Sequence, residues 1–220
     1  MHAVNKITAA VAGATGLVGG LLLRRLLDDP EVACVVAPTR RPLSPHPKLS
    51  NPSFDGAVWP SLPPLDEAYG CLGTTRKRAG GDDAFRAVDL LLTRSFARAA
   101  KAAGARRFGL VSSIGADKGS RFLYLRTKGE AEAAVSGFGF ENVAIVRPSF
   151  LLGERAEPRP AENLAIAALL VLGPALVGPL RRWRGVRAES VAASLVSVLR
   201  GRVPGTMILE SDVLSFSPST

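Results

Sequence analysis

A tyrosine and a lysine four residues apart, Tyr124 and Lys128, are the residues of this chain best suited to transfer a proton. On a helix, residues at this spacing lie on one face about one turn apart, so the ammonium group can reach the surroundings of the phenol. A free phenol has a pKa of about 10, and a nearby cation favours the phenolate, which brings the group closer to the range useful at neutral pH. The spacing predicts a general acid at Tyr124. The alternative is a tyrosine that packs on an amphipathic helix with its hydroxyl in water.

A glycine-rich turn, Gly13 to Gly19, follows the apolar run Ile7 to Ala12 and opens a helical pattern from Leu17 to Leu27. Glycines at this spacing between a strand and a helix are typical of a turn that binds a dinucleotide. Gly13 permits the tight turn, Gly16 lets the backbone approach the pyrophosphate, and Gly19 lets the helix pack closely on the sheet. The N-terminus of the helix attracts the phosphates. The contacts expected here come from Gly13, Thr15, Gly16, Leu17, Val18 and Gly19. A glycine trio can also form a loop without a ligand.

The residues after the second predicted strand indicate which dinucleotide is bound. An acidic residue at this place would bind the ribose 2′-hydroxyl of NAD, whereas an arginine would accept the 2′-phosphate of NADP. The chain reads Thr39-Arg40-Arg41, with no carboxylate nearby. Because guanidinium groups match the geometry of a phosphate, Arg40 and Arg41 favour NADP(H) as the cofactor. The alternative is an ordinary basic loop.

Short β-branched runs alternate with helical patterns, which predicts strand–helix–strand units and an α/β fold with a Rossmann-type doubly wound parallel sheet. The expected strands are 7–12, 32–37, 68–72, 108–112, 143–146 and 207–209, and the expected helices are 17–27, 84–103, 120–135 and 188–199. Residues 38–64 are expected to be mainly loop, with a short edge strand around Ala57-Val-Trp59, and 76–81 a basic loop. We expect residues 1–150 to form the NAD(P)-binding core, and 151–220 a small, mainly helical substrate lobe that covers the cleft and completes one compact domain.

Composition excludes several classes of site. The 220 residues are 47% hydrophobic, enough for one good core. Two cysteines, Cys34 and Cys71, lie in predicted buried strands and cannot build a disulfide framework or a zinc site, and neither histidine, His2 or His46, is placed as a ligand or base. The formal charge is +9, but the basic residues stand in short separated groups without interleaved aromatic residues. We therefore expect an anionic cofactor and no nucleic acid.

The apolar segment from Leu164 to Leu180 approaches the length of a membrane span, but Gly-Pro pairs at 173–174 and 178–179 interrupt it. A buried helix pair over the cleft is the preferred interpretation, and a peripheral membrane contact through the following 181–184 basic cluster is the alternative. The N-terminus shows no apolar stretch behind a positive leader, which predicts a cytoplasmic protein. The sequence leaves monomer and homodimer equally open.

Four segments resemble the atypical members of the short-chain dehydrogenase/reductase superfamily, and most of all its Tat-interacting-protein branch. They are Cys71-Leu-Gly-Thr-Thr-Arg-Lys-Arg-Ala-Gly80, Ser112-Ser-Ile-Gly-Ala-Asp-Lys-Gly119, Phe122-Leu-Tyr-Leu-Arg-Thr-Lys-Gly-Glu130 and Arg147-Pro148. The similarity covers most of residues 5–155 and is weaker beyond, so the identity of the substrate does not carry over.

The resemblance implies that NADPH delivers a hydride to a small carbonyl substrate, or serves an epimerase. Ser113 would orient the carbonyl, Tyr124 would give its proton, and Lys128 would also hold the nicotinamide ribose. Ser112 stays open as the alternative serine. Further cofactor contacts are implied at Leu72, Gly73, Thr74, Ser112, Arg147 and Pro148.

Two departures from the family pattern leave a second function open. Trp59-Pro60 stands where related proteins often place an acidic residue near adenine, and Asp89 occupies a helix position where catalytic members often have asparagine. A protein with these changes could bind NADPH without turnover and order a surface for a protein partner. The two hypotheses are therefore an NADPH-dependent reductase and a non-catalytic NADPH-binding regulator.

Overall fold

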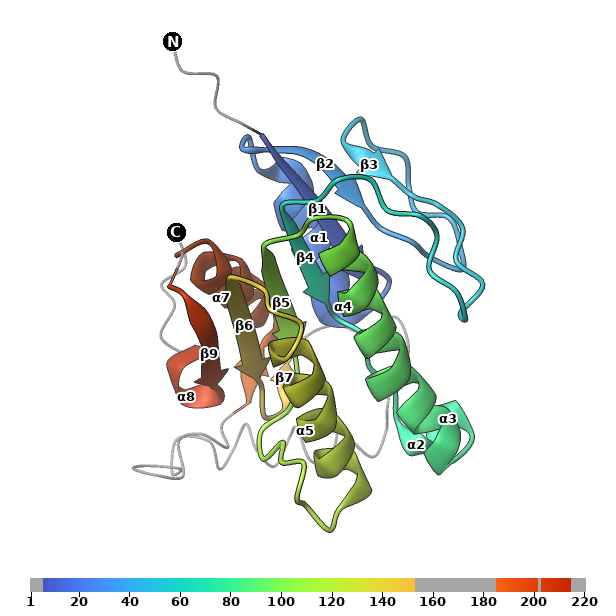
Figure 1. Ribbon diagram of the computed structural model, residues 1–220, viewed down its shortest axis with the longest axis vertical. Coiled ribbons are helices and arrows are strands. Elements are labelled where there is room, and N and C mark those ends of the chain that lie inside the picture. Colours follow the sequence, from blue (N-terminus) through green and yellow to red (C-terminus); the bar gives the residue numbers. More distant parts are fainter. Residues whose placement is uncertain (1–5, 153–184, 202, 215–220) are drawn as a thin grey trace.

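The structure is a computed structural model that describes residues 6–152, 185–201 and 203–214 (Figure 1). Its centre is a seven-stranded, fully parallel sheet with the strand order β3-β2-β1-β4-β5-β6-β9. These strands are β1 (Ile7–Ala12), β2 (Val32–Val36), β3 (Leu49–Ser50), β4 (Glu67–Gly70), β5 (Arg107–Val111), β6 (Asn142–Arg147) and β9 (Gly205–Glu210). A separate two-stranded ladder joins β7 (Leu151–Leu152) and β8 (Val186–Arg187). The predicted Rossmann-type α/β fold is confirmed.

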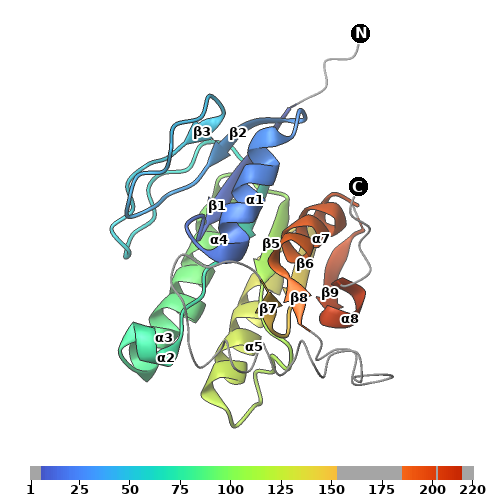
Figure 2. The same cartoon turned by 180° about the vertical axis from the view of Figure 1, so that it is seen from behind.

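Helices cover both faces of the sheet, as Figures 1 and 2 show from opposite sides. On one face lie α1 (Leu17–Asp28) and α7 (Ala188–Arg200), and on the other lie α4 (Thr93–Ala102) and α5 (Leu123–Ser136). The short helices are α2 (Arg76–Ala79), α3 (Asp82–Arg86) and α8 (Ser211–Leu214), and the π-helix η1 (Ala87–Leu92) joins α3 to α4. The predicted single helix over 84–103 is thus one continuous helical run with a wider turn in its middle.

The last four residues of strand β1 are buried on both faces, which explains why all four, residues 9–12, are apolar. Ala9 and Val11 belong to the core beneath α1 and α7, whereas Ala10 and Ala12 belong to the core beneath α4 and α5. Successive side chains of a strand point to opposite faces, so a strand between two helical layers needs apolar residues at every position.

The predicted edge strand at 57–59 is wrong, because the edge strand is β3, which pairs in parallel with β2. The Asp55 carboxylate accepts hydrogen bonds from the amides of Ala57, at 2.8 Å, and Val58, at 3.1 Å, so these amides serve a turn. Trp59 instead packs its ring on Phe54, with 4.0 Å between ring centroids. The predicted loop at 76–81 is also wrong in part. Its first four residues form α2, whose N-terminus is capped by the Thr75 hydroxyl.

The C-terminal part of the chain contributes to the same sheet. Strand β9 pairs in parallel with β6 along its whole length, and α7 packs against α1. The division between a core and a lobe at residue 150 stays a prediction. The segment expected to cover the cleft, including 164–180 and 181–184, lies outside the described residues. Within the described residues, no helix combines the length and the apolar character needed to cross a bilayer.

A buried network of charges closes the amino edge of the sheet. The Glu67 carboxylate at the start of β4 is fully buried and contacts Arg200 Nη2 at 2.8 Å and Arg107 Nη2 at 3.4 Å. The Tyr69 hydroxyl donates to Glu67 at 2.9 Å. Burial, followed by the Glu67 charge, raises the pKa of the Tyr69 phenol well above its ordinary value. Arg200 also pairs with Asp29, so it ties α7 to both the sheet and the end of α1.

Candidate functional site

The parallel register brings the carboxyl ends of β1, β4, β5 and β6 to one edge of the sheet, the lower edge in Figure 1. In open parallel sheets, ligands bind beyond this edge. The segments that the sequence marked for chemistry begin here: the glycine turn after β1, Cys71 to Thr74 after β4, Ser112 and Ser113 after β5, and Pro148 after β6. Helix α5, with Tyr124 and Lys128, lies beside them.

The glycine turn is too tightly packed for side chains at two of its positions. Gly13 has a φ of +84°, and a Cβ there would lie 2.5 Å from the Cys71 carbonyl oxygen. A Cβ on Gly19 would lie 2.1 Å from the Gly13 carbonyl oxygen. Helix α1 therefore starts directly against the turn, with Gly16 at its N-cap and no side chain capping it.

The first amides of α1, at residues 17–19, lack intrahelical acceptors because they belong to the first turn of a helix. The turn therefore offers backbone donors and the positive end of the helix dipole, which is the donor set that a pyrophosphate needs. Thr15 and Gly16 are exposed beside it. Val18 is buried in the core, so that residue can offer a ligand only its amide.

Replacing Gly19 by alanine is expected to lower the free energy of unfolding by about 1–3 kcal/mol or more, because the new methyl group overlaps the Gly13 carbonyl. Gly20→Ala is the matched control, since a Cβ on Gly20 comes no nearer than 3.3 Å to the Ala14 carbonyl oxygen. Urea unfolding of the two variants measures the difference. Equal stability of both variants would contradict the tight turn.

Lys128 and Asp89 form a buried ion pair in the middle of the site. Lys128 Nζ lies 2.7 Å from Asp89 Oδ1, and the two side chains are 8% and 0% exposed. The second carboxylate oxygen of Asp89 accepts a hydrogen bond from the Thr74 amide at 2.9 Å. Burial, the largest single effect, acts to lower the pKa of Lys128, but the charge and hydrogen bond of Asp89 together with Tyr124 and Glu132 outweigh it, and the pKa is raised above its ordinary value. The ammonium group is therefore charged at neutral pH.

Gly73, in the loop after β4, lies directly beside this ion pair. A Cβ on Gly73 would lie 3.8 Å from both Lys128 Nζ and Asp89 Oδ1. A side chain at residue 73 would therefore be in contact with the ammonium and the carboxylate.

Tyr124 stands one helical turn before Lys128 and is 40% exposed, so its ring is open to a ligand. The ring stacks on Phe85 of α3, with 5.7 Å between ring centroids and an interplanar angle of 27°. The sequence analysis did not identify Phe85 as a site residue. Its only signal there was its position four residues before Asp89.

The two candidate serines differ in what their hydroxyl groups contact. The Ser112 hydroxyl donates to Glu132 Oε1 of α5. The Glu132 carboxylate also accepts hydrogen bonds from Arg147, from Nε at 3.0 Å and from Nη2 at 2.6 Å. Ser112 therefore belongs to a network that joins β5, α5 and β6. The Ser113 hydroxyl makes only a long contact of 3.4 Å to the neighbouring Ile114 carbonyl. Ser113 is therefore the serine whose hydroxyl is better able to bind a ligand. Arg147 is paired with Glu132.

Arg40 and Arg41 are exposed just beyond the carboxyl end of β2. The loop that carries them is held by Thr39, whose hydroxyl donates to the Arg41 carbonyl at 2.7 Å. Asn51 supports Thr39 by donating to its hydroxyl at 2.8 Å. Asn51 is a positioning residue that the sequence analysis missed, since an asparagine in a proline-rich segment gives no signal of a long-range contact.

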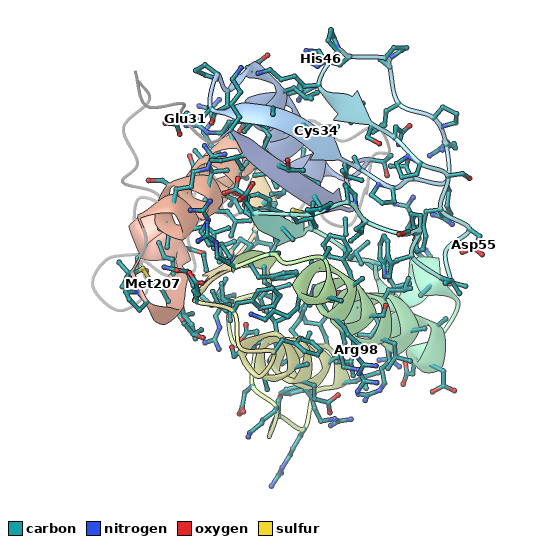
Figure 3. All side chains as sticks on the ribbon, turned by 45° about the horizontal axis from the view of Figure 1, so that its top comes forward. Glu31, Cys34, His46, Asp55, Arg98 and Met207 are labelled. Atoms are coloured by element: carbon teal, nitrogen blue, oxygen red, sulfur yellow. The ribbon has the colours of Figure 1, made fainter. Side chains whose placement is uncertain are left out.

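Among the described residues, neither His46 nor the Cys71 thiol is suited to act as a base or nucleophile. His46 lies at the outer edge of the molecule on the loop after β2, and its Nδ1 accepts from the Lys48 amide (Figure 3). Burial raises the pKa of the Cys71 thiol to about 12, although the Lys128 charge opposes this. The described residues contain no cluster of three or more His, Cys, Asp or Glu side chains that could hold a metal ion.

Comparison with known proteins identifies the relatives of the chain. It is 36% identical over 211 residues to Protein fmp52, mitochondrial, from Aspergillus niger, a match that spans 89% of each protein. It is 39% identical over 163 residues to Protein HTATIP2 from Rattus norvegicus, which spans 70% of this chain and 67% of the relative. No family model matches the sequence. The chain belongs to the family of the fmp52 and HTATIP2 proteins. The predicted place among atypical short-chain dehydrogenases/reductases is confirmed.

Solved structures share the fold at low sequence identity. MoeE5 in complex with UDP-glucose and NAD superposes with a TM-score of 0.68 at 19% identity, over 94% of this chain and 79% of MoeE5. The human epimerase family protein SDR39U1 with NADPH gives a TM-score of 0.63 at 18% identity, over 93% of this chain and 74% of that protein. The chain thus shares the Rossmann-type fold of these two proteins, one solved with NAD and the other with NADPH.

The expected cytoplasmic location is contradicted by the names of the fmp52 relatives, which place those proteins in mitochondria. The physical reason lies in the kind of signal considered. The absence of an apolar stretch argues against secretion, whereas organelle-targeting segments are amphipathic and arginine-rich rather than apolar. A missing apolar leader therefore does not distinguish a cytoplasmic protein from a mitochondrial one.

Proposed function

We propose that this protein is an NADPH-dependent reductase of a small carbonyl compound, with Tyr124 as the proton donor. Its O–H would give a proton to the carbonyl oxygen while the carbonyl carbon is reduced. Lys128 would favour this by its charge and would hold the nicotinamide ribose. Ser113, whose hydroxyl is the less engaged of the two serines, would orient the carbonyl. An epimerase working through the same cofactor belongs to the same proposal, since SDR39U1 is named an epimerase family protein.

The observation that carries this proposal is the buried, charged Lys128 ammonium on the same helix as the partly exposed Tyr124, one turn away. The ammonium lies 3.8 Å from where a Gly73 side chain would begin, and Gly73 belongs to the loop that leaves β4 at the same edge of the sheet as the glycine turn. The exposed phenol of Tyr124 on the same helix supplies the proton donor.

The residues at the edge fit a dinucleotide. The turn from Gly13 to Gly19 and its amides would hold the pyrophosphate, and the Gly73 to Thr74 segment would lie along it. When bound, NADPH supplies the hydride to the carbonyl carbon and leaves as NADP⁺. Arg40 and Arg41, exposed past the end of β2, would bind the 2′-phosphate that distinguishes NADPH from NADH.

Replacing Arg40 and Arg41 together by alanine is expected to weaken NADPH binding by at least about tenfold and to change NADH binding by less than about twofold, because only NADPH carries the phosphate. Titration followed by nicotinamide fluorescence measures both affinities. The Arg24→Ala, Arg25→Ala variant is the matched control, since this exposed pair on α1 carries the same charge. An equal loss of NADPH affinity in both variants would contradict a specific phosphate site.

A further inference from the structure

Two residues of the α3–η1 segment hold the two proton-transfer residues of α5. Phe85 and Asp89 are four positions apart, as are Tyr124 and Lys128. Phe85 stacks on the Tyr124 ring at 5.7 Å, and Asp89 pairs with Lys128 at 2.7 Å. Phe85 and Asp89 are 0% and 1% exposed, so both are fixed by their surroundings. One helical segment therefore positions the phenol and the ammonium together.

Asp89 sits in the π-helix, where the wider turn is found in many proteins at functional sites. Its carboxylate uses both oxygens, one for Lys128 and one for the Thr74 amide. The side chain thus joins α5 to the loop after β4. An asparagine at residue 89 could accept the hydrogen bond from the Thr74 amide equally well, but it could not offset the positive charge of Lys128.

The charges around Lys128 decide how its ammonium acts on the phenol. Those that face it are the Asp89 carboxylate from η1, the Cys71 thiol after β4, and the Tyr124 phenol and Glu132 carboxylate of α5. At the same interface, Arg86 of α3 and Glu130 of α5 pair with each other at 2.8 Å. Glu132 forms an ion pair with Arg147, with 2.6 Å between Oε2 and Nη2. Asp89 is therefore the charge that offsets Lys128 directly.

We propose that Phe85 and Asp89 are positioning residues, which hold the Tyr124 ring and the Lys128 ammonium in place, and that Asp89 offsets the Lys128 charge beside the phenol. A lone ammonium favours phenolate, the form that accepts a proton from an alcohol, whereas an offset ammonium leaves the phenol able to donate. The arrangement fits the site for carbonyl reduction rather than alcohol oxidation. In this respect it rests on the proposed function and deepens it.

The chain allows a direct measurement of this effect, because it has only two tyrosines, Tyr69 and Tyr124. Tyr69 is fully buried with its pKa raised well above the ordinary range, so tyrosinate absorbance in an alkaline titration reports Tyr124 alone. Tyr124→Phe confirms the assignment by removing the signal. This titration needs neither cofactor nor substrate. A failure of NADPH to bind would thus reject the proposed function while leaving this test intact.

The test compares Asp89→Asn, Lys128→Gln and the double variant with the unaltered protein. Asp89→Asn removes the offsetting charge and is expected to move the phenol titration to lower pH by on the order of one unit. Lys128→Gln leaves the Asp89 carboxylate without its partner and is expected to move the phenol titration to higher pH. The double variant removes both charges and is expected to titrate close to the unaltered protein.

An Asp89→Asn titration that is unchanged or moves to higher pH would overturn the proposal. Circular dichroism checks that each variant is folded. If either single variant fails to fold, the neutral double variant decides the matter, because it leaves no buried charge unpaired. A double variant whose phenol titrates at clearly lower or higher pH than that of the unaltered protein would then overturn the proposal.

Discussion

The Tyr124→Phe protein is expected to reduce carbonyl compounds about 10²- to 10⁴-fold more slowly than the unaltered protein, the loss that follows when a general acid is removed. The phenylalanine keeps the ring that stacks on Phe85, so the helix and its ion pair at Lys128 stay in place. The change removes only the hydroxyl. The measurement is the rate of NADPH consumption across a panel of aldehydes and ketones.

NADPH titration of the same variant provides the control for this prediction. Binding within about twofold of the unaltered affinity is expected, because the phosphate contacts assigned to the glycine turn and to Arg40 and Arg41 are untouched. Unchanged turnover in a folded Tyr124→Phe protein would remove Tyr124 from the acid role. If the unaltered protein binds NADPH but reduces no carbonyl in the panel, the non-catalytic regulator becomes the better account.

The second large effect is on stability, at the opposite edge of the sheet. Arg200→Leu is expected to lower the free energy of unfolding by about 3–5 kcal/mol, because it leaves the Glu67 carboxylate buried without its main partner. It also releases Asp29 at the end of α1. Urea unfolding of the purified variant measures the change.

Arg187→Leu is the control for this experiment. Its contact with Glu189 is 4.0 Å long, and both side chains are largely exposed, so the expected change is within about 0.5 kcal/mol. A loss of less than about 1 kcal/mol in Arg200→Leu would show that the network at Glu67 does not stabilise the fold as we describe.

Much of the fold could be predicted because its signals are local. A run such as Ile7–Ala12, followed by a glycine turn and a helical pattern, fixes a strand, a turn and a helix from neighbouring residues alone. The spacing of Tyr124 and Lys128 likewise placed both on α5. Parallel strands share one edge, so the order of these local elements was enough to bring the candidate residues together.

What the sequence did not reveal depends on contacts between distant residues. Nothing near Phe85 marks it as the residue that stacks on Tyr124, and a π-helix has no simple sequence signal. The ion pair between Arg147 and Glu132 was not foreseen either, while the cofactor contact that the resemblance implies for Arg147 stays a prediction. The sequence around Trp59 predicts a strand, but the segment is not a strand and the Trp59 ring stacks on Phe54.

Hydrogen–deuterium exchange with and without NADPH tests the central claim most directly, because it locates binding without knowledge of the substrate. We predict slower exchange at the amides of 13–19 and 73–74 in the presence of NADPH, and no change at the opposite edge around Glu67 and Arg107. Unchanged exchange at the glycine turn under saturating NADPH, or protection confined to other parts of the chain, would contradict the account.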